Sequence, residues 1–100
     1  MFKPDIATNI LQHSQLDYQH KVFLLWCWDR SLDKIRYDLT SCRQNCGVRN
    51  RTVQWYANKM GIHRQRMSIV LIQLKELGIV KIEYEGTRNE CTYVDFTMFC

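Results

Sequence analysis

The sequence contains little of the two residues that interrupt regular structure, with one proline and four glycines among 100 residues. Linkers and low-complexity segments are usually rich in these residues, so neither is expected here. No internal repeat is visible, and a chain of this length suffices for one domain but not for two. We therefore expect a single domain over residues 1–100.

Long hydrophobic runs are also missing. The longest apolar run covers residues 22–28 and stops at Asp29 and Arg30, far short of the ~20 residues that span a bilayer. The first residues lack the apolar stretch and the cleavage site of a signal peptide. These absences predict a cytoplasmic protein without a membrane partner.

Carboxylates are absent from residues 39–75, whereas the flanking segments 1–38 and 76–100 contain five acidic residues each. The seven basic residues of the carboxylate-free segment are Arg43, Arg49, Arg51, Lys59, Arg64, Arg66 and Lys75. Such a block is typical of a surface that meets a polyanion. The alternative is a solvated face on which basic residues cluster by chance.

Catalytic signatures are missing too, because no nucleophile elbow, phosphate-binding loop or metalloprotease motif occurs. We expect no enzyme activity and no cofactor. The five cysteines are odd in number and follow no secretion signal, which favours reduced thiols over a disulfide framework. The spacing Cys42-x-x-x-Cys46 would put two thiols on one face of a helix, which leaves metal binding or redox sensing open. The Cys-x-x-Cys knuckles of structural zinc sites are absent, however.

Hydrophobic periodicity predicts a mainly α protein with a C-terminal β-hairpin, in the α+β class. Apolar residues recur at helical spacing over residues 4–12, 17–31, 33–46, 53–59 and 64–77. In the most apolar helix, we expect one core-facing stripe, formed by Val22, Leu25, Trp26 and Leu32 and widened by Phe23, Cys27 and Trp28. Alternating apolar and polar residues then predict two strands, separated by the turn residues 86–89.

Residues 52–77 contain the local signals of a helix-turn-helix. Thr52 is a good N-cap for a short helix, and Ala57 is small enough for a second helix to approach. Gly61 suits the backbone angle of the turn, and Ile62 fills the angle between the helices. The second helix has one apolar stripe, made of Met67, Val70, Leu71, Leu74 and Leu77.

This order of signals resembles the winged helix-turn-helix superfamily, in particular MarR-like regulators and the replication initiators of plasmids and phages. The resemblance is carried by Ala57-x-x-x-Gly61-Ile62, then Leu71-x-x-Leu74-x-x-x-Gly78-Ile79-Val80, then a charged hairpin. It implies that residues 79–98 form the wing and that the second helix enters the DNA major groove.

The resemblance also implies which residues contact DNA. The candidates for reading bases are His63, Arg64, Gln65, Arg66, Ser68 and Ile69. Of these, Gln65 and Ile69 point furthest from the apolar stripe, and His63 is equally well interpreted as a helix cap. The candidates for phosphate contacts are Arg49, Arg51, Thr52, Gln54 and Lys59.

The wing is less typical, because Arg88 and Asn89 at its tip are surrounded by three glutamates. An acidic wing approaches DNA poorly. Trp55 and Tyr56 lie among the phosphate candidates, but we expect them to pack in the core rather than to stack on bases.

The sequence thus predicts a sequence-specific protein that binds double-stranded DNA, acting as a transcription regulator of bacterial, plasmid or phage type. Two alternatives stay open: a replication initiator of a plasmid or phage, and a winged-helix adaptor that binds proteins. We also expect a homodimer held by the helix within residues 1–16, because that helix has little core left to cover.

Overall fold

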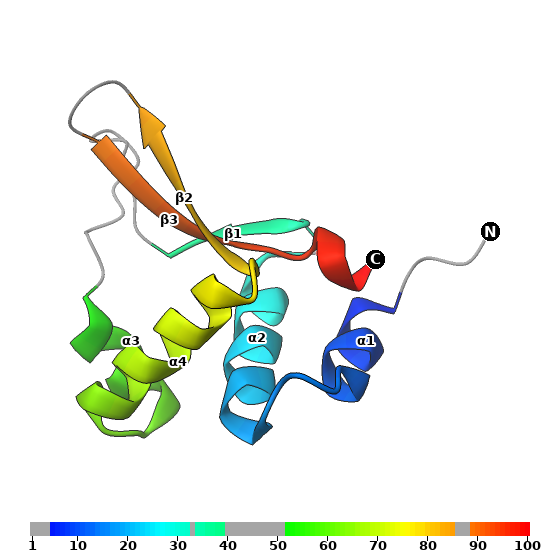
Figure 1. Ribbon diagram of the computed structural model, residues 1–100, viewed down its shortest axis with the longest axis horizontal. Helices are drawn as coiled ribbons and strands as arrows, with labels where there is room; N and C mark the ends of the chain where they lie inside the picture. The colour runs from blue at the N-terminus through cyan, green and yellow to red at the C-terminus, as the bar shows by residue number, and fades with distance from the viewer. Residues whose placement is uncertain (1–4, 33, 40–51, 86–88) are drawn as a thin grey trace.

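The computed structural model describes residues 5–32, 34–39, 52–85 and 89–100, with the backbone alone at residues 84, 85, 89 and 90. Predictions about other residues lie outside these ranges, among them those for Arg49, Arg51, Arg88, Cys42 and Cys46. The described elements are α1 (Ile6–Gln12), α2 (Tyr18–Arg30), β1 (Arg36–Asp38), α3 (Val53–Met60), α4 (Arg64–Glu76), β2 (Val80–Glu85), β3 (Asn89–Asp95) and the 3-10 helix η1 (Thr97–Phe99) (Figure 1).

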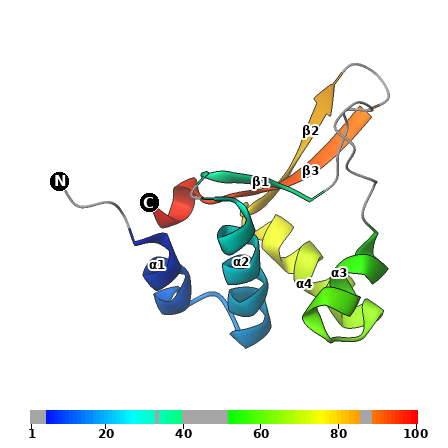
Figure 2. The same ribbon diagram turned by 180° about the vertical axis from the view of Figure 1, so that it is seen from behind.

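The described part of the chain is mainly helical and carries a small antiparallel sheet, as the sequence predicts. The strand order is β1-β3-β2, so the central strand is the last one in sequence. Val94 of β3 lies opposite both Val80 of β2 and Tyr37 of β1. Figures 1 and 2 show the helices on one side of the sheet, with the β2–β3 hairpin extending beyond them. None of the helices in the described ranges is long and apolar enough to cross a membrane.

Helix α2 lies at the centre of the core, and its buried face agrees only in part with the expected one. Phe23 and Cys27 are buried, and Leu25, Trp26 and Trp28 pack partly buried against the core. Leu24, which the predicted stripe did not contain, is fully buried, whereas Val22 and Leu32 are 38% and 81% exposed. The prediction was therefore wrong for Val22, Leu24 and Leu32. Apolar residues occur on nearly every side of this helix, so their spacing alone does not select the face that the neighbouring helices cover.

Helix α1 begins at Ile6, because the Asp5 carboxylate accepts a hydrogen bond from the Thr8 backbone N–H at 3.1 Å and caps the helix. Ile6 and Ile10 are buried in the domain's own core. The assumption that this helix has little core to cover was therefore wrong, and a homodimer formed through it stays a prediction.

Strand β1 occupies part of the segment 33–46, for which helical spacing predicted a helix. That prediction was wrong for residues 36–38, which pair with β3. The backbone of Ile35 accepts from Phe96 N–H, and Leu39 N–H donates to Thr92, both at 2.8 Å. Residues 35–39 alternate between apolar and polar side chains, and this period of two indicates a strand. The helical spacing of the wider segment obscured it.

Candidate nucleic-acid interface

Helices α3 and α4 are joined by a tight turn, and local signals fix both the start of α3 and this turn. Thr52 caps α3, since its hydroxyl accepts from Trp55 N–H at 3.2 Å. Gly61 ends α3 with φ 67° and ψ 30°, a left-handed conformation that glycine adopts without a steric penalty. Ile62 N–H then donates to the carbonyl of Ala57 at 3.1 Å. Ala57 is fully buried, as expected for a residue that lets two helices approach closely.

Helix α4 has a buried face and an outward face. Met67, Val70 and Leu74 are fully buried in the core. On the opposite side Gln65 is exposed, and Ile69 and Ile72 keep 43% and 53% of their surfaces exposed. The core residues therefore fix the direction in which the outward face points.

The outward face had one member that the sequence analysis missed, namely Ile72. Helical geometry places Ile72 almost opposite Val70 and Leu74 across the helix axis. Its position three residues after Ile69 is the signal that would have identified it. A large aliphatic side chain at such a position is costly in water and gains from contact with a partner.

The N-terminal end of α4 is exposed and contains the next candidates. His63 caps the helix, because its Nδ1 accepts from Gln65 N–H at 3.2 Å. This agrees with the interpretation of His63 as a cap. An accepting Nδ1 places the ring proton on Nε2, which is a hydrogen-bond donor. Arg64 follows as an exposed cation, and Ser68 lies half-buried one turn later.

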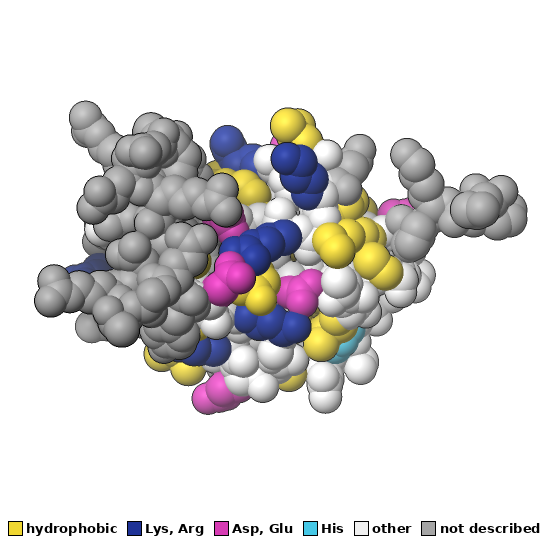
Figure 3. All heavy atoms as spheres, turned by 90° about the horizontal axis from the view of Figure 1, so that it is seen from above, with side chains coloured by type: hydrophobic (Ala, Val, Ile, Leu, Met, Phe, Trp, Pro, Cys, Tyr) yellow, Lys and Arg dark blue, Asp and Glu magenta, His cyan; other side chains and the backbone are white. Residues whose placement is uncertain are grey.

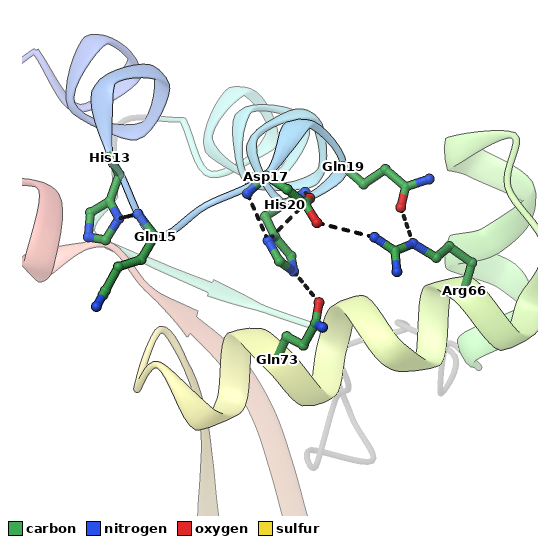
Figure 4. A network of polar contacts seen from close by, with 7 residues as sticks. All are labelled: His13, Gln15, Asp17, Gln19, His20, Arg66 and Gln73. Carbon is green, nitrogen blue, oxygen red and sulfur yellow. Dashed lines mark hydrogen bonds and ion pairs between the residues drawn. The ribbon is translucent and has the colours of Figure 1, made fainter.

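Arg66 lies differently from its neighbours, because its guanidinium faces α2 (Figure 4). Its Nε donates to Gln19 Oε1, and its Nη2 lies 3.2 Å from an oxygen of Asp17. Burial raises the pKa of Asp17, but the backbone N–H groups of His20 and Gln19 and the charge of Arg66 outweigh this effect and lower it. Arg66 therefore helps to hold α4 against α2 in this arrangement, rather than pointing outward like Gln65.

A second polar contact joins the same two helices further along. His20 is buried, its Nε2 lies 2.7 Å from Gln73 Oε1, and its Nδ1 accepts from Asp17 N–H at 3.1 Å. The accepting Nδ1 again assigns the proton to Nε2, which donates to Gln73. Together with the Arg66 contacts, this bond fixes α4 against the start of α2 (Figure 4).

The described phosphate candidates lie on or beside α3. Thr52 is occupied as the cap of this helix, and the Gln54 amide donates to Asn58 at 2.8 Å on its exposed surface. The Lys59 ammonium lies 5.2 Å from the centre of the Trp55 ring, an arrangement that favours a cation. Trp55 packs against the core and Tyr56 is buried in it, which confirms the prediction that both are core aromatics.

The outer face of the sheet is charged as well, but the charged side chains that the structure describes there are paired. Arg36 bonds to Glu83 at 2.6 Å and to Asp38 at 2.9 Å, and its guanidinium lies 3.9 Å from the Tyr93 ring centre. Lys81 bonds to Asp95 at 2.7 Å. Figure 3 looks onto this side of the molecule, where basic and acidic side chains lie next to one another. Glu83 is therefore neutralised by a strand that the sequence analysis did not predict.

The thiols differ from the expectation. Cys27 and Cys100 are free, but Cys91 is disulfide-bonded, so the prediction of reduced cysteines was wrong for Cys91. Burial raises the pKa of the Cys27 thiol well above its ordinary value. Among the described residues, no group of three His, Cys, Asp or Glu is placed to hold a metal ion.

No protein-family model, curated protein or solved structure matches this chain. The geometry of the residues is therefore the basis for any functional proposal.

Proposed function

We propose that this protein is a winged helix-turn-helix protein that binds double-stranded DNA, with α4 as the helix that enters the major groove. The observation that carries the proposal is the outward face of α4. It begins with His63, Arg64 and Gln65, continues through Ile69 and Ile72, and contains no carboxylate before Glu76. The β2–β3 hairpin follows α4 directly, in the place of a wing.

The chemistry of this face suits the edges of base pairs. The amide of Gln65 has a donor and an acceptor for adenine, and the guanidinium of Arg64 can donate twice to guanine. Ile69 and Ile72 present methyl groups that fit against the methyl group of thymine. Exposed isoleucines would thereby become buried upon binding, which favours A·T-containing sites.

The positioning contacts come from the residues around α3. The proposal assigns Lys59 to a phosphate and keeps Thr52 and Gln54 as further phosphate contacts through polar groups at the start of this helix. Arg49, Arg51, Arg88 and Asn89 remain candidates as the resemblance implies. Arg66, a candidate for reading bases, can reach DNA only if its bonds to Asp17 and Gln19 open when DNA binds.

Selection of bound duplexes from a random pool, followed by fluorescence anisotropy over a range of salt, tests the proposal. We expect log Kd to rise linearly with log salt, since bound phosphates release counterions. Gln65→Ala should weaken binding to the selected duplex by about 1–3 kcal/mol and leave binding to a scrambled duplex unchanged. Lys59→Ala should weaken binding to both duplexes to a similar extent.

Lys34→Ala is the matched control, because Lys34 is exposed between α2 and β1 and lies outside α3 and α4. It removes the same charge as Lys59→Ala and should not change either affinity. Binding that is independent of salt, or an equal loss in the Lys34 and Lys59 variants, would contradict the proposal.

Protein contact through the same face is the second candidate function, and the exposure of Ile69 and Ile72 favours it. A protein partner would bury both side chains in an apolar pocket. Ile72→Asn distinguishes the two functions. It should abolish binding to a protein, whereas DNA binding should shift in base preference at one position.

A further inference from the structure

A pocket of about 190 Å³ lies between the start of α2 and the unit formed by α3, the turn and α4. Its floor consists of Phe23, Met67 and Val70, all of which are buried. Its rim includes Tyr18, which is 80% exposed, and Val22. The remaining lining residues are Gln19, Met60 and Ile62.

The lining defines the chemistry of an occupant. None of the described residues that line the pocket is charged, so a charged molecule would lose hydration without gaining a partner. The rings of Tyr18 and Phe23 favour an aromatic occupant through offset or edge contacts. The thioethers of Met60 and Met67 add sulfur–aromatic contacts, and their unbranched chains adapt to the shape of the occupant.

The volume limits the size of the occupant. An apolar cavity of about 150 Å³ can hold one benzene molecule, and this pocket is somewhat larger. It therefore has room for one substituted six-membered ring, but not for a helix or a strand of a partner protein. The exposed Tyr18 ring at the rim would cover such a molecule and lose its own contact with water.

We propose that this pocket binds a small neutral aromatic molecule. The ligand would contact α2, the end of α3, the turn and α4 simultaneously, and so would stabilise their packing. This site does not depend on DNA binding, since its lining residues are distinct from the outward face of α4.

Titration with phenol, followed by the methionine methyl signals of the ¹³C-methyl-methionine protein, tests the site. The methyl signals of Met60 and Met67 should shift and saturate, with a Kd of about 0.1–5 mM for so small a ligand. Met98 is the internal control, because it lies in η1 and does not line the pocket. Benzoate and cyclohexanol should shift the same signals at least tenfold less at equal concentration.

Two variants separate the pocket from general surface binding. Val22→Trp places a ring in the mouth of the pocket and should abolish saturation, while Leu11→Trp adds the same ring on the exposed surface of α1 and should not. At ten times the Kd, phenol should raise the Tm of the unmodified protein by about 6–11 °C.

Three results would overturn the proposal. One is a linear, unsaturated shift that is equal at Met60, Met67 and Met98. Another is equal binding of benzoate or cyclohexanol. The third is a shift of the Met60 and Met67 signals with protein concentration alone, which would assign the pocket to a side chain of a second copy.

Discussion

Two surfaces of this domain carry basic residues, and they differ in what surrounds each charge. On the outer face of the sheet, Arg36 and Lys81 each bond to a carboxylate within 3 Å. At the start of α4, Arg64 lies in a segment, residues 52–75, that contains no carboxylate. The first surface neutralises itself, whereas the second keeps a field that can attract a polyanion. A count of basic residues would not separate the two surfaces.

Charge reversal gives the sharpest test of this difference. Arg64→Glu should lower the affinity for duplex DNA by about tenfold or more at 0.15 M salt, because it removes a cation that donates to base edges and adds a charge that the DNA repels. Lys81→Glu makes the same change in net charge on the paired surface and should alter the affinity less than twofold. Anisotropy at several salt concentrations measures both effects. Equal losses in the two variants would show that only net charge matters.

The direction of the outward face depends on the turn before α4, and this dependence can be broken at Gly61. Gly61→Ala should lower the free energy of unfolding by about 1–2 kcal/mol, because alanine is strained at φ 67°. A methyl group there would meet no atom within 4 Å, so the loss comes from the backbone alone. Urea unfolding measures the loss. Gly61→Asn is the control and should lose less, since asparagine tolerates left-handed angles.

Acid should lower the free energy of unfolding through both regions, the contact between α2 and α4 and the outer face of the sheet. This loss should be smaller than that of Gly61→Ala. The pKa of Asp17 lies below its ordinary value of 3.8 in the folded protein. A lowered folded pKa adds stability that is present above the unfolded pKa and is lost as the pH falls through the folded pKa. Urea unfolding between pH 6 and pH 2 should therefore show a loss that begins below about pH 4.

Asp17→Asn tests the assignment of that loss. The variant should be less stable than the unmodified protein at pH 6, with a smaller further decrease in acid. Lys81 gives Asp95 a comparable environment, because its hydrogen bond and those of Thr97 outweigh burial and lower the Asp95 pKa. Some acid sensitivity should therefore persist in the variant. An identical pH profile for the two proteins would assign the sensitivity elsewhere.

Helices α3 and α4 and the turn between them could be predicted from the sequence because their signals are local. Thr52, Gly61 and Gly78 each mark an element end within a few residues, and the structure places a cap or a left-handed glycine at each. The outward direction of Gln65 and Ile69 follows from the same short segment. Helical geometry alone relates them to the buried face of α4.

What could not be predicted depends on residues that are distant in sequence. Asp17 lies 49 positions before Arg66, so no pattern around Arg66 indicates that its guanidinium faces α2. Strand β1 is equally hard to find, because three residues become a strand only when β3 lies beside them. The pairing of Arg36 with Glu83, which neutralises part of the β2–β3 hairpin, depends on that strand.

The cap of α4 also fixes the orientation of a ring. Because Nδ1 of His63 accepts from Gln65 N–H at 3.2 Å, Nε2 carries the ring proton and is a donor on an exposed side chain. An aspartate cap would accept the same bond but would offer no donor of its own. The residue that starts α4 therefore holds a donor in a fixed direction beside Arg64 and Gln65.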